Sequence, residues 1–352
     1  MRRVILSVIL IGISFWACSN TGQNPLLKKF ETPFGTPPFA EIQEKHYMPA
    51  FKEAMKQHQQ EIAAIADNPE PATFENTIEA MEASGEVLDR VSGVFYNLLS
   101  ANTNDEMQAI AQEVAPMMSK HTDDILLNEK LFQRIKAVYD QQENLDLNAE
   151  QKTVLDKYYK QFVRGGANLP EDKKAELRKI NEELSVRSLK FGENVLKETN
   201  KFEMVIEDEA DLAGLPENVI SAAAEAAKER GYEGKWVFTI HKPSMIPFLQ
   251  YSEKRDLREK IFKVYINVGN HDDELDNKAN ASKMAALRVK RANLLGYPTH
   301  AHFVLEENMA KEPKNVYDLL NQLWKPALVR AKQEAKELQA LIDKEGKNFK
   351  LQ

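Results

Sequence analysis

The stretch Leu287–Ala310, LRVKRANLLGYPTHAHFVLEENMA, is the part of the sequence that most clearly decides the fold. Its apolar spacing up to Gly296 predicts the end of one helix, and the glycine supplies a tight stop. Pro298 cannot continue that helix, and the Thr299 hydroxyl can cap the free amides of a second one. The stretch therefore predicts a helix, a short turn and another helix, which indicates an α-helical chain.

The same stretch holds two histidines close together, His300 and His302, followed by Glu306 and Glu307. A zinc hydrolase usually carries His-Glu-x-x-His on a helix, because two imidazoles one turn apart face the same metal and the Glu activates water. None of the seven histidines stands in that pattern. On a helix His302 and Glu306 share a face but His300 points elsewhere, so we interpret these residues as the polar first turns of a capped helix. Metal binding here would need a third ligand from another part of the chain.

Other candidate sites are weaker. His271-Asp272-Asp273-Glu274 is acidic enough to attract a cation, but we interpret it as the charged first turn of a helix, where carboxylates offset the helix dipole. The sequence has no Gly-x-Ser-x-Gly elbow, and Gly165-Gly166 is a helix stop rather than a phosphate cradle. The residues alone therefore assign no catalytic or metal-ligating side chain.

The composition fits a chain with a substantial helical core. Of the 352 residues, 43% are hydrophobic and 29% are charged, which indicates long solvated helical faces rather than disorder. The formal net charge is −7, with 47 basic and 54 acidic residues. No basic stripe stands out, so nucleic acid is not an expected partner.

The N-terminus has the pattern of an export signal. Two arginines precede an apolar run over residues 4–17, and Cys18 follows Ala17 as in a bacterial lipoprotein. We predict a signal peptide over residues 1–17, lipidation of Cys18 and a Pro-rich tether over residues 18–38. The protein would then be lipid-anchored in the cell envelope, facing the periplasm. A plain signal peptide or an N-terminal anchor helix remains the alternative, since Phe15 replaces the leucine usual in a lipobox.

Residues 39–201 read as a series of helices. The predicted helices open at Pro49, Thr73, Thr103, Asn148 and Pro170. The second carries an apolar stripe over residues 74–98, and the third meets Pro116, which should kink or divide it. The fourth stops at Gly165-Gly166, and the fifth runs to about Asn200, a rod of about 45 Å.

The character of the sequence changes after Lys201. Residues 202–207 and 235–240 are the best strand candidates and are predicted to pair as a small ribbon. A short helix between them begins after Pro216 and ends at Gly231.

From Ser244 the pattern is helical again. Pro313 opens a last helix, which Pro326 should interrupt and Gly346 should stop.

Several segments resemble the thimet-oligopeptidase-like zinc metallopeptidases, and most of all the bacterial peptidyl-dipeptidase (Dcp-type) branch. The resemblance runs from about Asn24 to Gln352. It is carried by Phe39–Met55 (FAEIQEKHYMPAFKEAM), Pro71–Met81 (PATFENTIEAM), Ser100–Asn128 (SANTNDEMQAIAQEVAPMMSKHTDDILLN) and Leu287–Ala310.

The resemblance implies a mainly α fold: a multi-helix lobe of a two-lobed thimet-oligopeptidase-like (neurolysin-like) fold, with a small β ribbon near residues 202–241. Residues 39–201 would form the N-terminal helical domain, and residues 202–352 the start of a second helical region. In the family, a channel between the lobes admits short peptides, and the peptidyl-dipeptidases release dipeptides from the C-terminal end. Zinc is held by the two His of His-Glu-x-x-His and a Glu on a following helix, and the motif Glu is the general base.

No family zinc or catalytic residue can be placed on this chain, because the resemblance covers only the N-terminal half of the family's chain. We therefore expect the N-terminal portion of a secreted zinc peptidase, truncated before its zinc-binding part, monomeric, inactive alone and without bound zinc. The alternative is a non-catalytic helical lipoprotein that acts as a peptide-binding or scaffold module. An exposed apolar patch where the other half would dock favours the first hypothesis, and a surface without one favours the second.

Overall fold

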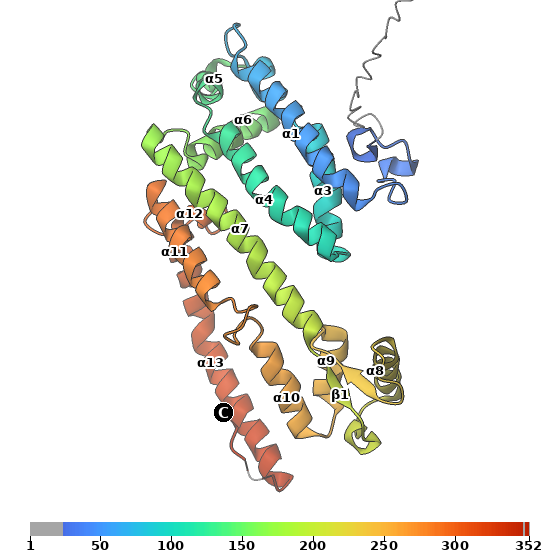
Figure 1. Ribbon diagram of the computed structural model, residues 1–352. Coiled ribbons are helices and arrows are strands. Elements are labelled where there is room, and N and C mark those ends of the chain that lie inside the picture. The colour runs from blue at the N-terminus through green and yellow to red at the C-terminus, as the bar shows by residue number, and fades with distance from the viewer. Residues whose placement is uncertain (1–23, 348, 352) are drawn as a thin grey trace, which may run out of the picture. The chain divides into compact units, whose positions relative to one another are not determined.

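The computed structural model describes residues 24–347 and 349–351, and the regular secondary structure of these residues is helical apart from one two-stranded sheet (Figure 1). The predicted signal peptide and Cys18 lie outside the described residues. The chain forms two compact units, of which the first ends at Phe162 and the second begins at Val163. No helix within the described part of the chain combines the length and apolar character needed to cross a bilayer.

The first unit is a group of helices that pack through aromatic side chains. Its main elements are α1 (Glu44–Ala66), a π-helical turn (Phe74–Glu79), α2 (Ala80–Glu82), α3 (Glu86–Ala101), α4 (Asp105–Leu126), α5 (Glu129–Tyr139) and α6 (Ala149–Gly165), the last of which crosses the unit boundary. Phe95 of α3 meets Tyr47 and Phe51 of α1 edge to face, with ring centroids 5.0 and 5.3 Å apart. All three rings are buried, so they fix α1 against α3.

The start of the first helix differs from the prediction. The sequence predicts Pro49 in its first turn, but α1 begins at Glu44, and Pro49 lies inside the helix. The amide of Gln43 donates to Nδ1 of His46 at 3.0 Å, which satisfies the free N-terminus one turn earlier. The His46 side chain, as a hydrogen-bond acceptor, therefore stabilises the start of α1 at Glu44, and the helix accommodates Pro49 in its interior.

The second predicted helix is not continuous. Gly85 adopts a left-handed φ of 82° and separates α2 from α3. The apolar residues predicted for a single helix over residues 74–98 are therefore divided between the helical segments before and after Gly85. The third helix is capped by Asn104, whose side chain accepts from the Met107 amide at 2.8 Å, and not by Thr103 as predicted. That helix, α4, continues through Pro116 without dividing, so of the two predicted effects, a kink or a division, the division does not occur. The sequence reading missed α5, although Asn128 caps it.

The second unit is built on one long helix and one small sheet. Its elements are α7 (Glu171–Lys201), β1 (Met204–Ile206), a short 3-10 helix (Glu209–Leu212), α8 (Glu217–Glu229), β2 (Trp236–Phe238), α9 (Lys242–Tyr251), α10 (Arg255–Ile266), α11 (Lys278–Leu294), α12 (His300–Leu305) and α13 (Pro313–Lys344). The two strands pair antiparallel, with Met204 opposite Phe238. The predicted long helix, ribbon and short helix are all confirmed, and Phe238 packs on Phe248 of α9 with ring centroids 4.6 Å apart.

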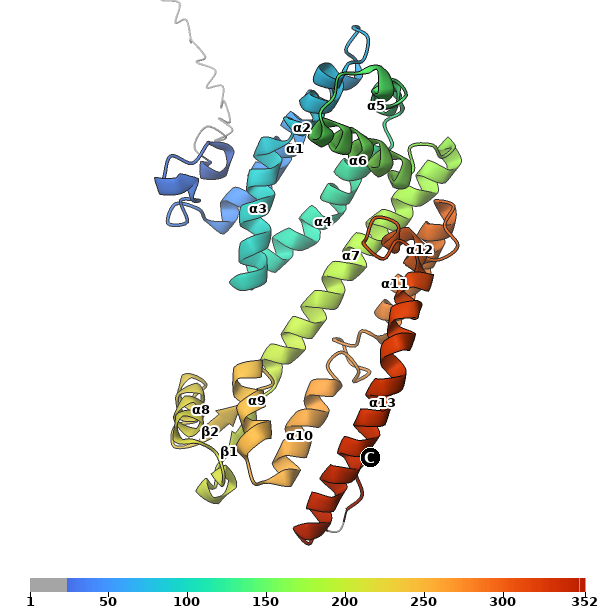
Figure 2. The same cartoon turned by 180° about the vertical axis from the view of Figure 1, so that it is seen from behind.

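Helices α7 and α11 lie side by side in both views (Figures 1 and 2). Ile180 and Leu184 of α7 form a buried cluster with Met284 and Leu287 of α11. This packing joins α7 to the second unit, so the unit boundary lies before α7 rather than at the change of sequence character after Lys201.

The last helix, α13, also differs from the prediction. It runs as one helix through Pro326, where we expected an interruption, and a left-handed Gly346 follows its end as predicted. Pro326 costs one backbone hydrogen bond, which the rest of this 32-residue helix outweighs.

Candidate functional site

The stretch that decided the fold has the predicted structure. Helix α11 ends at Leu294, Gly296 has φ +88°, and α12 begins at His300. The Thr299 hydroxyl accepts from the His302 amide at 3.3 Å, which is the predicted cap.

Glu306, one of the carboxylates considered as a metal ligand, is held by an arginine and a tyrosine. Arg164, at the end of α6, forms an ion pair with its carboxylate. The Tyr297 hydroxyl donates to the same carboxylate at 2.5 Å. Arg164 also donates to the Tyr297 hydroxyl at 3.1 Å and to the Phe303 carbonyl at 2.7 Å. Burial, followed by the bond to Glu306, raises the pKa of Tyr297. We call Arg164, Tyr297, Phe303 and Glu306 the arginine clamp.

The two histidines of this stretch have different surroundings. Nδ1 of His302 lies 2.8 Å from the Thr299 hydroxyl, so the cap engages this imidazole. His300 stacks on Phe303 with ring centroids 6.3 Å apart, and its buried Nδ1 has no hydrogen-bond partner among the described residues. Burial, together with the charges of Arg291 and Arg288, lowers the pKa of His300. These side chains hold α12 in place and do not converge on one point.

The acidic segment His271–Glu274 is a loop, and its prediction as the first turn of a helix is wrong. Helix α11 begins only at Lys278, because the Asp276 carboxylate accepts from the amides of Asp272 and Lys278, each at 2.8 Å. These two bonds lower the pKa of Asp276 to about 2. Nε2 of His271 lies 2.8 Å from a carboxylate oxygen of Glu198 in α7. The Asp276 carboxylate thus stabilises the conformation of this loop through hydrogen bonds to its backbone.

Across residues 24–347 and 349–351, no group of three or more His, Cys, Asp or Glu side chains is arranged to hold a metal ion. The described residues therefore do not fit a zinc centre.

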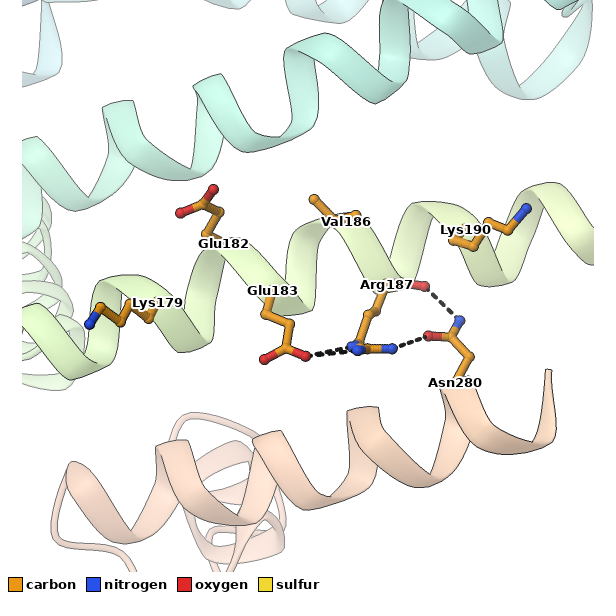
Figure 3. A pocket seen from close by; sticks show the side chains of 7 residues that line it. All are labelled: Lys179, Glu182, Glu183, Val186, Arg187, Lys190 and Asn280. Carbon is orange, nitrogen blue, oxygen red and sulfur yellow. Dashed lines mark hydrogen bonds and ion pairs between the residues drawn. The ribbon is translucent and has the colours of Figure 1, made fainter.

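A surface pocket of about 440 Å³ lies along α7, and Asn280 of α11 contributes to its lining (Figure 3). It is lined by Lys179, Glu182, Glu183, Val186, Arg187, Lys190 and Asn280. Arg187 bonds Glu183 at 2.8 Å and the Asn280 side chain at 3.3 Å, and Asn280 donates back to the Arg187 carbonyl at 3.0 Å. The lining thus combines basic and acidic side chains with one amide and one apolar side chain.

Sequence reasoning missed a histidine pair in the first unit. Nε2 of His121 in α4 lies 3.0 Å from Nδ1 of His58 in α1, and the Ser84 hydroxyl is 3.4 Å from the other His58 nitrogen. Burial lowers the pKa of both imidazoles. The two residues stand 63 positions apart, so no local pattern could have found the pair.

The comparisons with known proteins point to one family. The model of peptidase family M3 matches residues 248–352. The chain is 36% identical over 332 residues to a dipeptidyl carboxypeptidase of Escherichia coli (strain K12), covering 94% of this chain and 49% of that protein. It is 33% identical to a dipeptidyl carboxypeptidase of Salmonella typhimurium, covering 94% of this chain and 48% of that protein. It is 29% identical to oligopeptidase A of Escherichia coli, covering 92% of this chain and 47% of that protein. The chain therefore spans about half the length of these relatives.

Proposed function

Because the chain belongs to the thimet-oligopeptidase-like peptidases of family M3 and corresponds to the N-terminal half of their Dcp-type branch, we propose that it supplies the N-terminal helical part of a zinc metallopeptidase. The substrates would be short peptides, from which the enzyme releases C-terminal dipeptides. One observation carries this proposal: the similarity to a dipeptidyl carboxypeptidase extends over 94% of the chain, across both units.

The zinc ion and its general base would come from the part of the family's polypeptide that these 352 residues do not include. Two features of the chain support this division. No His-Glu-x-x-His occurs in the sequence, and Glu306 is engaged by Arg164 and Tyr297. The chain alone would accordingly be inactive.

We also propose that the protein is exported and anchored through a lipid on Cys18. The arginines before the apolar run over residues 4–17, and the cysteine directly after it, support this placement. Metabolic labelling with palmitate should mark the wild-type protein and leave Cys18→Ser unlabelled and released from the membrane fraction. Unchanged membrane association of Cys18→Ser would contradict the anchor.

The enzymatic proposal can be tested with a fusion. The C-terminal half of the Escherichia coli dipeptidyl carboxypeptidase is joined after Gln352, and the fusion is compared with the 352-residue chain alone. Hydrolysis is followed by mass spectrometry on short peptides with a blocked N-terminus, and zinc is measured by elemental analysis. We expect the fusion to hold one zinc and release C-terminal dipeptides, and the chain alone to do neither.

The controls separate the two halves. A fusion with the motif Glu of the added half changed to Gln should keep its zinc and lose hydrolysis. Cleavage and one zinc per molecule in the 352-residue chain alone would contradict the proposal. A folded, zinc-loaded fusion without any hydrolysis would instead support a peptide-binding or scaffold module.

A further inference from the structure

Helix α13 carries an apolar face that nothing in the described structure covers. None of its 32 residues is buried. Nine of its large apolar side chains are exposed: Tyr317, Leu319, Leu320, Leu323, Trp324, Leu328, Val329, Leu338 and Leu341. A helix this long in a globular protein is ordinarily stabilised by burying one face, because isolated helices are marginal in water.

The apolar side chains of α13 follow helical spacing. The half-buried Val316 and the exposed Leu320, Trp324, Ala331 and Leu338 recur at intervals of four or seven residues and so share one side of the helix. We call this side, from Val316 to Ile342, the apolar face of α13; it is about 40 Å long. The opposite side carries charges, among them Lys325, Lys332 and Lys336. The helix is therefore amphipathic, with its apolar side in solvent.

The size of the face is that of a protein interface rather than of a chance patch. Tyr317 and Trp324 are each 64% exposed. At about 150–250 Å² per aromatic side chain, these two alone present about 200–300 Å². The exposed leucines extend this area beyond the largest patch usual on a monomer, about 300–600 Å².

The exposure is not confined to α13. In the same unit Phe262, Tyr265 and Ile266 of α10, and Tyr251 at the end of α9, are also exposed. A single pairing of α13 with its copy would cover one helix, whereas these residues spread over three. The surface fits one large partner better than a second copy of this chain.

The family comparison supplies the argument for one such partner. The match to the M3 family model runs over residues 248–352, which includes the C-terminal end of α9 and all of α10 and α13. The relatives extend for about as much polypeptide again as the matched part. The exposed apolar surface thus lies within the matched segment, and half of the relatives' length is available to cover it.

We propose that the apolar face of α13 is the docking surface for the C-terminal half of the M3 family's polypeptide. This inference rests on the proposed function, since it takes its partner from the same family. Burying Leu320, Leu323 and Trp324 would supply the hydrophobic driving force for joining the two halves. The charged side of α13, including Val329, would stay in solvent.

Thiol labelling tests the surface directly. Cys18 is the only cysteine, so in a Cys18→Ser background an introduced cysteine is unique in these 352 residues. Leu320→Cys lies at the centre of the apolar face, and Val329→Cys, nine residues on, lies on the opposite side of the helix. The wild-type side chains are 52% and 69% exposed, so both positions should label rapidly in the 352-residue chain.

The same two variants are then placed in the fusion with the Escherichia coli C-terminal half. We expect maleimide labelling at position 320 to slow at least about 100-fold, which corresponds to about 2.7 kcal/mol of protection. Labelling at position 329 should change less than about threefold. Mass spectrometry of the peptide that carries each cysteine separates it from any cysteine of the added half.

A charge substitution gives a second readout. Leu320→Glu should make the fusion elute as an expanded species in size-exclusion chromatography with light scattering, whereas Val329→Glu should elute as the wild type. Equal labelling rates at position 320 in the chain and in the folded fusion would overturn the docking surface. A dimer of the 352-residue chain that Leu320→Glu dissolves would assign the face to a second copy instead.

The outcome does not depend on activity. A fusion that hydrolyses peptides while position 320 labels at its original rate would refute the docking surface and leave the proposed function standing. A fusion that is protected at position 320 but neither binds zinc nor hydrolyses peptides would refute the proposed function and leave the docking surface standing.

Discussion

Arg164 lies over the ring of Phe303, with its guanidinium carbon 4.5 Å from the ring centroid, and donates through Nη2 to the carbonyl oxygen of the same residue at 2.7 Å. These two contacts join the end of α6 to α12, which stands 139 residues later in the chain. The arginine side chain is mostly buried, so its hydrogen bonds form where water is scarce.

The arginine clamp should therefore matter for stability. Arg164→Met keeps much of the apolar stem and removes the charged hydrogen bonds, and we expect it to lower the free energy of unfolding by about 2–3 kcal/mol. Lys179→Met, at an exposed position on α7, is the control and should change stability by less than about 0.5 kcal/mol. Chemical denaturation of both variants measures the difference, and equal midpoints would contradict the clamp.

The residues around His300 should not bind zinc in this chain. Glu306 is engaged by the clamp and His302 by its cap, so we expect less than about 0.1 zinc per chain after dialysis against a slight excess of the metal. His300→Ala with His302→Ala should give the same zinc content as the wild type. One zinc per wild-type chain that this double variant loses would show that the two imidazoles are ligands.

Two left-handed glycines should respond differently to the same substitution. Gly296 has φ +88° with nothing within 4 Å of an added Cβ, so Gly296→Ala should cost only backbone strain, about 1–2 kcal/mol. At Gly214, with φ +85°, an added Cβ would stand 2.4 Å from the Tyr251 carbonyl oxygen. Gly214→Ala should cost about 1–3 kcal/mol more because the backbone must move. Thermal denaturation measures the loss of stability in each variant. Equal losses in the two variants would contradict the predicted clash at Gly214.

The pair of His58 and His121 should make stability depend on pH. Burial lowers the pKa of both imidazoles from the usual 6.5, so between that value and their lower folded pKa the unfolded chain binds more protons than the folded one. The free energy of unfolding should fall as the pH drops below about 6.5, and the contribution should be constant above it.

A double variant isolates this contribution. His58→Gln with His121→Gln removes both titrating groups while keeping polar side chains at the two positions. Urea denaturation at pH 7.5 and pH 5.5 should show a smaller loss of stability in the double variant than in the wild type. An equal loss in both proteins would mean that carboxylates, and not this pair, carry the pH dependence.

The sequence determined the local elements of this protein. Gly296 followed by Pro298 and Thr299 produced the predicted stop and restart, because a left-handed glycine, a missing amide and a hydroxyl cap act within a few residues. The long α7 and the pairing of residues 204–206 with 236–238 were likewise predictable from spacing and strand propensity. Some of the wrong predictions concern side-chain bonds, such as Asn104 in place of Thr103, which compete within a single turn. Others concern the backbone, such as Pro326, which α13 accommodates without interruption.

The tertiary structure decided which side chains meet. His58 and His121, or Arg164 and Phe303, lie far apart in sequence, and only the packing of their helices brings them within bonding distance. It also decided the roles of His300, His302 and Glu306, since a pattern of ligand-type residues carries no information on whether another group has already bound them. The spacing of its leucines makes α13 amphipathic. Only the fold decides that the apolar face of α13 is exposed to solvent, because exposure depends on what the rest of the chain covers.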